Sequence, residues 1–282
     1  MNSQEIQLPE NHREILDRFV AACQADDRIV AAFIGGSYAT GKVDEHSDLD
    51  LFFITTDSAY GDFILERERF ACLLGEPLFR ESFGLDHGYC LIFSNMSECE
   101  FWFGRESNFK GIYSGPYKVL LDKKGILAGE VFPAHMADPV RQVELLRQQI
   151  DWFWHELSHF MKAMARRQLW FAYGELEALR QICVTLARLR YDFSDDHIRG
   201  EPYFKIEQAL PTQELASLQS TFCPMEYQAM LQAALVICRF YQDVAPGLAK
   251  AHHLPYQTDL ERIMIGQLRE LSRAGSILPP QT

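Results

Sequence analysis

Long apolar stretches are what this sequence of 282 residues most clearly lacks. No run reaches about eighteen unbroken apolar residues, the length at which a transmembrane helix becomes a candidate, so we expect no membrane span. Residues 1–11 are polar and hold no apolar core of a signal peptide. The seven cysteines are odd in number and include no Cys-x-x-Cys pair, which is typical of reduced thiols in a protein core. We therefore expect a cytoplasmic protein.

A basic excess is also missing. Lys and Arg total 27 against 39 Asp and Glu, which gives a formal net charge of −12. Proteins that bind nucleic acid through its phosphates carry a basic face, so we expect no nucleic-acid partner. An acidic surface instead favours a small cationic ligand. The hydrophobic share of 48% is that of an ordinary globular protein with an ample core.

The most informative stretch of the chain is residues 33–51. It consists of an apolar strand, a Gly-Gly-Ser turn, a short polar connection and a second strand that opens with Asp48 and Asp50. Residues two apart on a strand point to the same face, so these two carboxylates lie side by side. Carboxylates together with substrate phosphates are the ligands that Mg²⁺ prefers. We therefore predict that Asp48 and Asp50 bind a metal ion.

The Gly-Gly-Ser turn is predicted to bind the phosphates whose metal ion the carboxylate pair holds. Glycine lets the backbone approach a ligand closely, and exposed amides at such a turn form a cradle for an anion. Ser37, after Gly36, adds a hydroxyl that can donate to a phosphate oxygen. Together the turn and the carboxylates predict a site for a triphosphate and Mg²⁺; two solvated aspartates in a polar hairpin are the simpler interpretation.

This pattern resembles the signature of the nucleotidyltransferase superfamily, in which Gly-Ser is followed by Asp-x-Asp or Asp-x-Glu. The resemblance implies a third carboxylate on a later strand, which acts as a metal ligand or as a general base. A strand over 98–103 places Glu98 and Glu100 on one face and apolar side chains on the other. We predict Glu100 in this role because aromatic residues follow it directly, with Glu98 as the alternative. A solvated edge strand would explain both glutamates without a function.

Hydrophobic periodicity divides the chain into an α/β half and a helical half. Strands are predicted over 29–34, 49–54, 78–83, 89–93, 98–103 and 117–122, with helices over 10–25 and 62–74. After a connection bounded by prolines, at 132–139, the pattern is helical over 140–166, 169–191, 203–209, 213–221, 226–244 and 259–273. We predict an α+β protein with domains at 1–132 and 140–282.

Basic residues near these elements are candidates for binding phosphate. Lys42 lies in the loop between the turn and the carboxylates, and Arg166 closes the first long helix of the second half. Arginine stays charged and grips phosphate oxygens in a bidentate way. The alternative for Arg166 is that it complements the dipole at the C-terminus of its helix.

A competing motif lies in the helical half. His155-Glu156-Leu157-Ser158-His159 matches His-Glu-x-x-His, in which both histidines of one helix face bind zinc and the glutamate acts as a base. Glu175 or Glu177 is a candidate third ligand. Aromatic residues crowd the same helix, which is typical of a bundle core. The motif also leaves the Gly-Ser and Asp-x-Asp unit unexplained.

The resemblance extends past the motif to the antibiotic nucleotidyltransferases, which include lincosamide and aminoglycoside enzymes. It rests on residues 27–32, Gly36-Ser37, Ser47 to Asp50, the strand from Glu100 to Phe103, Arg166 and residues 260–263. It implies an N-terminal nucleotidyltransferase domain with a mixed β-sheet that binds a nucleoside triphosphate and Mg²⁺. It also implies a C-terminal helical bundle for substrate binding and dimerisation, and a homodimer.

The resulting hypothesis is transfer of a nucleoside monophosphate, expected to be AMP from ATP, to a hydroxyl of a small antibiotic, with release of pyrophosphate. Asp48, Asp50 and Glu100 would hold Mg²⁺ and carry the chemistry, and Gly36, Ser37, Lys42 and Arg166 would bind the nucleotide. Two alternatives stay open: a nucleotide-binding antitoxin or sensor of the same fold, and a zinc hydrolase using His155, Glu156 and His159.

Overall fold

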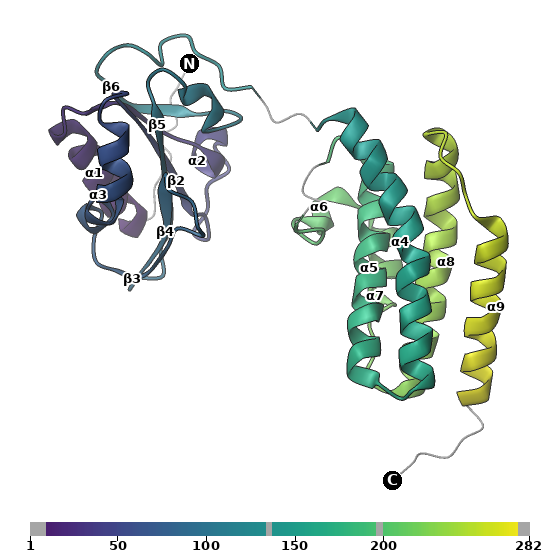
Figure 1. Ribbon diagram of the computed structural model, residues 1–282. Coiled ribbons are helices and arrows are strands. Elements are labelled where there is room, and N and C mark those ends of the chain that lie inside the picture. The colour runs from purple at the N-terminus through teal and green to yellow at the C-terminus, as the bar shows by residue number, and fades with distance from the viewer. Residues whose placement is uncertain (1–9, 134–136, 196–199, 276–282) are drawn as a thin grey trace. The chain divides into compact units, whose positions relative to one another are not determined.

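The computed structural model describes residues 10–133, 137–195 and 200–275. The chain divides into two compact units, Met1–His135 and Met136–Thr282. The first contains the sheet and the second is helical, so the predicted α+β class is confirmed (Figure 1).

The first unit is built on a mixed sheet. Its described strands are β1 (Ile29–Ile34), β2 (Leu49–Thr55), β3 (Pro77–Glu81), β4 (Gly88–Phe93), β5 (Glu98–Arg105) and β6 (Lys118–Asp122). They lie in the order β3-β4-β5-β2-β1-β6, and only the pairing of β2 with β5 is parallel among these described strands. The parallel pair brings two strands that are far apart in sequence into register at the centre of the sheet.

The two faces of the sheet differ in what covers them. Helices α1 (Glu10–Ala25) and α3 (Tyr60–Leu73) pack on one face, against the buried rings of Phe53, Phe101 and Phe103 (Figure 1). The other face is covered by a smaller core formed with the segment that follows β5, including the 3₁₀ turn Phe109–Gly111. Strand alternation puts Asp50 on this second face, beside Phe52.

A short helix that the sequence pattern did not predict follows β1. Helix α2 (Gly36–Thr40) occupies what was expected to be a turn and a polar connection. It forms because Tyr38 is buried in the core of the unit, at 4% exposure, and anchors the segment. Gly41 ends the helix in the left-handed conformation that glycine favours, with φ at 72°.

The second unit is a helical bundle. Its long helices are α4 (Pro139–Ala165), α5 (Leu169–Tyr191), α8 (Tyr227–Ala251) and α9 (Thr258–Gly275), with α6 (Ile206–Ala209) and α7 (Thr212–Gln219) between them (Figure 1). Asp138 caps α4 by accepting from the amide of Val140, and Pro139 occupies the first turn. Each long helix packs against at least two of the others around one apolar core.

The prediction that α8 ends at Val244 was wrong. The helix runs through Pro246 to Ala251. Proline removes one backbone hydrogen bond, but Leu248 and Ala249 beyond it are buried in the bundle, and that packing outweighs the loss. None of the described helices is long and apolar enough to cross a membrane.

Candidate active site

Sheet register brings the predicted acidic residues together. Asp50 lies directly opposite Glu100 in the parallel pairing of β2 and β5. Asp48 precedes β2, two residues before Asp50, and lies close enough for its charge to act on Asp50. Burial, followed by the negative charges of Asp48 and Glu100, raises the pKa of Asp50 to about 6. The three carboxylates thus form one electrostatically coupled group.

The backbone of Gly36 lies against the carboxylate of Asp50. Gly36 has a φ of +53°, and a Cβ built on it would overlap Oδ2 of Asp50. The preceding amide, that of Gly35, donates to the Asp50 carbonyl over 2.9 Å and extends the pairing of β1 with β2. Only glycine fits at position 36, because both the conformation and the space exclude a side chain.

Ser37 holds an unused polar group. Its Oγ is buried and has no hydrogen-bond partner among the described residues. Buried hydroxyls normally find a partner, so the Ser37 hydroxyl retains hydrogen-bonding capacity that the described residues do not satisfy. Ser37 follows Gly36 directly in α2, close along the chain to the Asp50 contact.

Tyr113 completes the glycine turn, although no motif in the sequence pointed to it. Its hydroxyl accepts from the Gly36 amide over 3.0 Å and donates to the Pro116 carbonyl over 2.7 Å. Its ring packs on Phe33 and Phe52, and it fills the space next to Gly35. The Gly36 amide, which was expected to face an anion freely, is therefore bonded to a side chain 77 residues away.

Both oxygens of Glu100 are held by neighbouring side chains. Cys90, which is opposite Glu100 on β4, donates from Sγ to Oε1 over 3.3 Å. Trp102 donates from Nε1 to Oε2 over 3.2 Å. The Trp102 ring has room because Gly88 lies opposite it, where a Cβ would overlap the ring. Glu98, the alternative to Glu100, is exposed at the start of the strand.

A buried pair from α1 and α2 lies near Asp48. His12 Nδ1 is hydrogen-bonded to the Tyr38 hydroxyl, and both side chains are almost fully buried. Burial lowers the pKa of His12, and the negative charge of Asp48 opposes that shift. Burial and the same aspartate raise the pKa of Tyr38 to about 12. The hydrogen bond of this pair links α2 to α1. The helical pattern of residues 10–25 did not distinguish His12 from a surface residue.

The two predicted basic residues lie in different units. Lys42 follows α2 in the first unit, exposed and without an ion pair to the described residues. Arg166 follows α4 in the second unit, where its side chain is exposed. The neighbouring Arg167 is engaged, with its guanidinium 3.8 Å from the centre of the Tyr227 ring.

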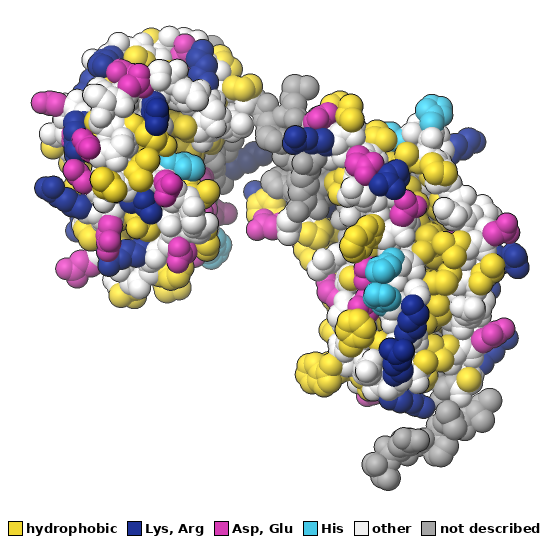
Figure 2. Space-filling view, viewed as in Figure 1, with side chains coloured by type: hydrophobic (Ala, Val, Ile, Leu, Met, Phe, Trp, Pro, Cys, Tyr) yellow, Lys and Arg dark blue, Asp and Glu magenta, His cyan; other side chains and the backbone are white. Residues whose placement is uncertain are grey.

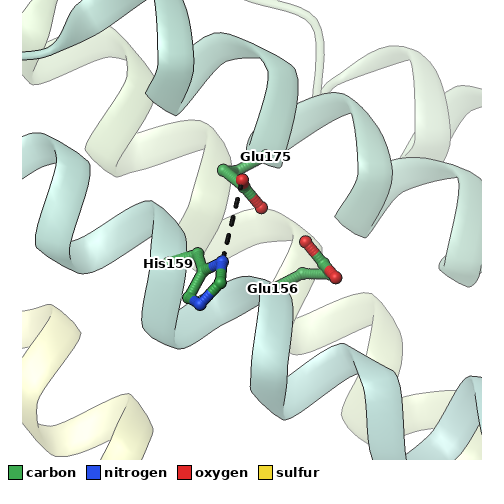
Figure 3. A group of neighbouring side chains, drawn as sticks. All are labelled: Glu156, His159 and Glu175. Atoms are coloured by element: carbon green, nitrogen blue, oxygen red, sulfur yellow. Dashed lines mark ion pairs between the residues drawn. The ribbon is translucent and has the colours of Figure 1, made fainter.

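The His-Glu-x-x-His motif lies on α4, where the rings of His155 and His159 lie 4.3 Å apart between their centroids. Glu156 and His159 form a group with Glu175 of α5, whereas His155 is exposed and does not belong to it (Figure 3). In the hydrolase pattern the two histidines bind the metal and Glu156 does not. The other candidate third ligand, Glu177, forms an ion pair with Arg180 instead.

Comparison with known proteins gives one family. Residues 10–270 match the family model described as streptomycin adenylyltransferase. Among solved structures, the chain is similar to an aminoglycoside 6-adenyltransferase from Bacillus subtilis, with 17% sequence identity over 94% of this chain and 99% of that one, and a TM-score of 0.41. No curated protein matches the chain significantly.

Exchange of Gly36 for alanine tests the contact with Asp50. The added Cβ must displace the carboxylate, so Gly36→Ala should lower the free energy of unfolding by about 2 kcal/mol or more. Gly41→Ala is the matched control, because Gly41 also has positive φ but an added Cβ there would meet no atom within 4 Å. It should cost only about 1 kcal/mol. Calorimetry of the two variants measures the difference; equal losses would contradict the contact.

Neutralising Asp50 should stabilise the protein. The pKa of Asp50 is raised in the folded state, so its ionisation costs stability as pH rises from about 4, the ordinary value, to about 6. With a chelator present, Asp50→Asn should therefore raise the free energy of unfolding at pH 7.5 by on the order of 1–3 kcal/mol, and by less as the pH falls toward 4.

The control for this experiment is Asp17→Asn, at an exposed position on α1. It should leave the unfolding temperature unchanged at both pH values. A loss of stability in Asp50→Asn at pH 7.5 would show that the carboxylate is satisfied without a bound cation.

Proposed function

Because the chain belongs to the streptomycin adenylyltransferase family, we propose that it transfers AMP from ATP to a hydroxyl of an aminoglycoside and releases pyrophosphate. The enzyme is a nucleotidyltransferase of the adenylyltransferase type. The observation that carries the proposal is the convergence of Asp48, Asp50 and Glu100 beside Gly36. Streptomycin, which the family description names, is a cationic aminoglycoside, and the net charge of −12 favours such an acceptor. A lincosamide is the second candidate.

Mg²⁺ fits the acidic group. Asp48 and Asp50 would hold it, with Glu100 as a further oxygen ligand. The raised pKa of Asp50 supports this assignment, because burial and two like charges make its ionised form costly until a cation balances it. When bound, the ion would neutralise charge on the triphosphate and polarise the phosphorus under attack.

Residues of the glycine turn would hold the nucleotide. The unpartnered Ser37 hydroxyl is a ready donor to a phosphate oxygen, and Gly36 keeps the backbone close to Asp50. The Gly36 amide becomes available only when the Tyr113 hydroxyl releases it. Lys42 and Arg166, both exposed, would add positive charge to the phosphates.

Glu100 is proposed as the base that takes the proton of the acceptor hydroxyl. The bonds from Cys90 and Trp102 fix the direction of its carboxylate, which reduces the reorganisation needed for proton transfer. Each carboxylate oxygen has a second lone pair, so these bonds leave Glu100 able to accept a proton.

The proposed reaction also has consequences for the partners and the cellular location of the protein. We expect a cytoplasmic homodimer that acts on a small molecule and binds neither nucleic acid nor membrane, with the first unit catalytic and the second binding the acceptor. Acidic, basic and apolar side chains are interspersed over the face of each unit that Figure 2 shows. The formal net charge of −12 supports the expectation that nucleic acid is not a partner.

Transfer of label from α-labelled ATP tests the function. With Mg²⁺, the wild-type protein should label streptomycin or another aminoglycoside in a panel that includes a lincosamide. Asp50→Ala should lose about a thousandfold or more in rate. Glu100→Gln should lose roughly a hundredfold to ten-thousandfold, because the base is removed while the side-chain shape is kept. Glu98→Gln is the matched control on the same strand face, and should stay within about threefold.

Each of the other possible outcomes would favour a different assignment of the site or of the function. Labelled acceptor with Asp50→Ala at the wild-type rate would contradict the site. A larger loss in Glu98→Gln than in Glu100→Gln would move the base to Glu98. ATP binding without label on any acceptor would favour the nucleotide sensor, and zinc-dependent hydrolysis lost in His155→Ala would favour the hydrolase.

A further inference from the structure

The side chains that converge between α4 and α5 form a second acidic group, separate from the first unit. Glu156 and His159 project from α4, and Glu175 projects toward them from α5 (Figure 3). One ligand atom of each residue lies within 4.8 Å of the others. The spacing Glu-x-x-His puts the two α4 residues on one face of the helix, one turn apart. The same Glu-x-x-His spacing, joined by glutamates from other helices, builds metal sites in helical bundles.

Glu175 provides an independent sign of a ligand. Its side chain is only 9% exposed, and its Oε2 atom is buried without a hydrogen-bond partner among the described residues. The other oxygen, Oε1, lies 4.0 Å from Nδ1 of His159. The Glu156 carboxylate lies beside this buried group, and two neighbouring carboxylates are costly unless they share a proton or bind a cation.

We propose that Glu156, His159 and Glu175 bind one divalent transition-metal ion of the Zn²⁺ class, which ties α4 to α5. One imidazole and two carboxylates suit Zn²⁺, and three protein ligands leave a position for water. With metal–ligand bonds of about 2.1 Å, the ligand atoms of a tetrahedral site lie about 3.4 Å apart, so side-chain rotations that bring these atoms together by roughly 1 Å would close the site. The site is separate from the residues assigned to the proposed transfer reaction, and an ion bound there would link α4 to α5.

This ligand set differs from the one that the His-Glu-x-x-His motif implies. In the hydrolase pattern, His155 and His159 are ligands and Glu156 is a base. Here the ring of His155 lies 4.3 Å from that of His159, between centroids, but His155 is exposed and outside the group that includes Glu175. The two sets therefore predict opposite effects for substitutions at positions 155 and 156.

Zn²⁺ titration of metal-free full-length protein tests the proposal. An Asp48→Ala/Asp50→Ala background removes two carboxylates of the first unit, so the remaining strong binding reports on the helical unit. We expect one equivalent of Zn²⁺, and Co²⁺ should give the visible absorption of a low-symmetry site. Glu156→Gln, His159→Ala and Glu175→Gln should each weaken binding by on the order of tenfold or more, and His155→Ala by less than about twofold.

Thermal unfolding gives a second readout. Zn²⁺ should raise the unfolding temperature of the background protein and of His155→Ala, but not of Glu175→Gln, because only native-state binding stabilises. Far-ultraviolet circular dichroism checks that Glu175→Gln folds. The half-buried Glu156→Gln variant repeats the test without altering the core.

Two results would overturn the proposal. One is the absence of stoichiometric Zn²⁺ binding at micromolar concentration. The other is a loss of binding in His155→Ala with binding retained in Glu156→Gln, which would assign the hydrolase ligand set. Neither result bears on label transfer, which depends on Asp50 in the first unit, so failure of this proposal and failure of the proposed function are distinguishable.

Discussion

The contact between the Gly36 backbone and the Asp50 carboxylate is the constraint on which the first unit depends. The carboxylate can occupy that position only because residue 36 lacks a Cβ and adopts a positive φ. The positive φ in turn starts α2, whose buried Tyr38 reaches the core and meets His12. On the other side, the Tyr113 ring fills the space beside Gly35 and its hydroxyl bonds the Gly36 amide. The glycine turn, helix α2 and the loop that carries Tyr113 thus all help to fix the position of the Asp50 carboxylate.

Electrostatic repulsion explains why several contacts are needed to hold the Asp50 carboxylate in place. Asp50 is half-buried beside two other carboxylates, an arrangement that the folded chain would relax if its parts could move apart. The register of β2 with β5 prevents this, because Asp50 and Glu100 are held opposite each other by the sheet. Holding these carboxylates close together lowers the free energy of unfolding but keeps the acidic group preorganised. Such a cost is common where a protein binds a cation or performs chemistry.

The sequence alone predicted the features that follow from local periodicity, namely most of the helices, the strands and the strand face that Glu98 and Glu100 share. Alternation along a strand was enough to put Glu98 and Glu100 on one face of β5, whereas Asp48, predicted to share a face with Asp50, lies just before β2. Alternation was not enough to pair the strands, and the pairing decides that Glu100 lies opposite Asp50. Tyr113 and His12 were missed because their contacts join segments far apart in the chain, and neither lies in a motif. Glu175 was one of two candidates, and only the packing of α5 on α4 distinguishes it from Glu177, which pairs with Arg180. The roles assigned to all these residues stay predictions.

The hydrogen bond from Cys90 to Glu100 has a consequence for redox chemistry. Burial, and then the bond to Glu100, raises the pKa of the Cys90 thiol to about 12. Oxidants and electrophilic drugs react with thiolates, and at neutral pH almost none forms at this position. The Cys90 thiol therefore stays protonated at neutral pH and can donate to the carboxylate. A covalent inhibitor directed at this cysteine would meet the protonated thiol, the less reactive form of the side chain.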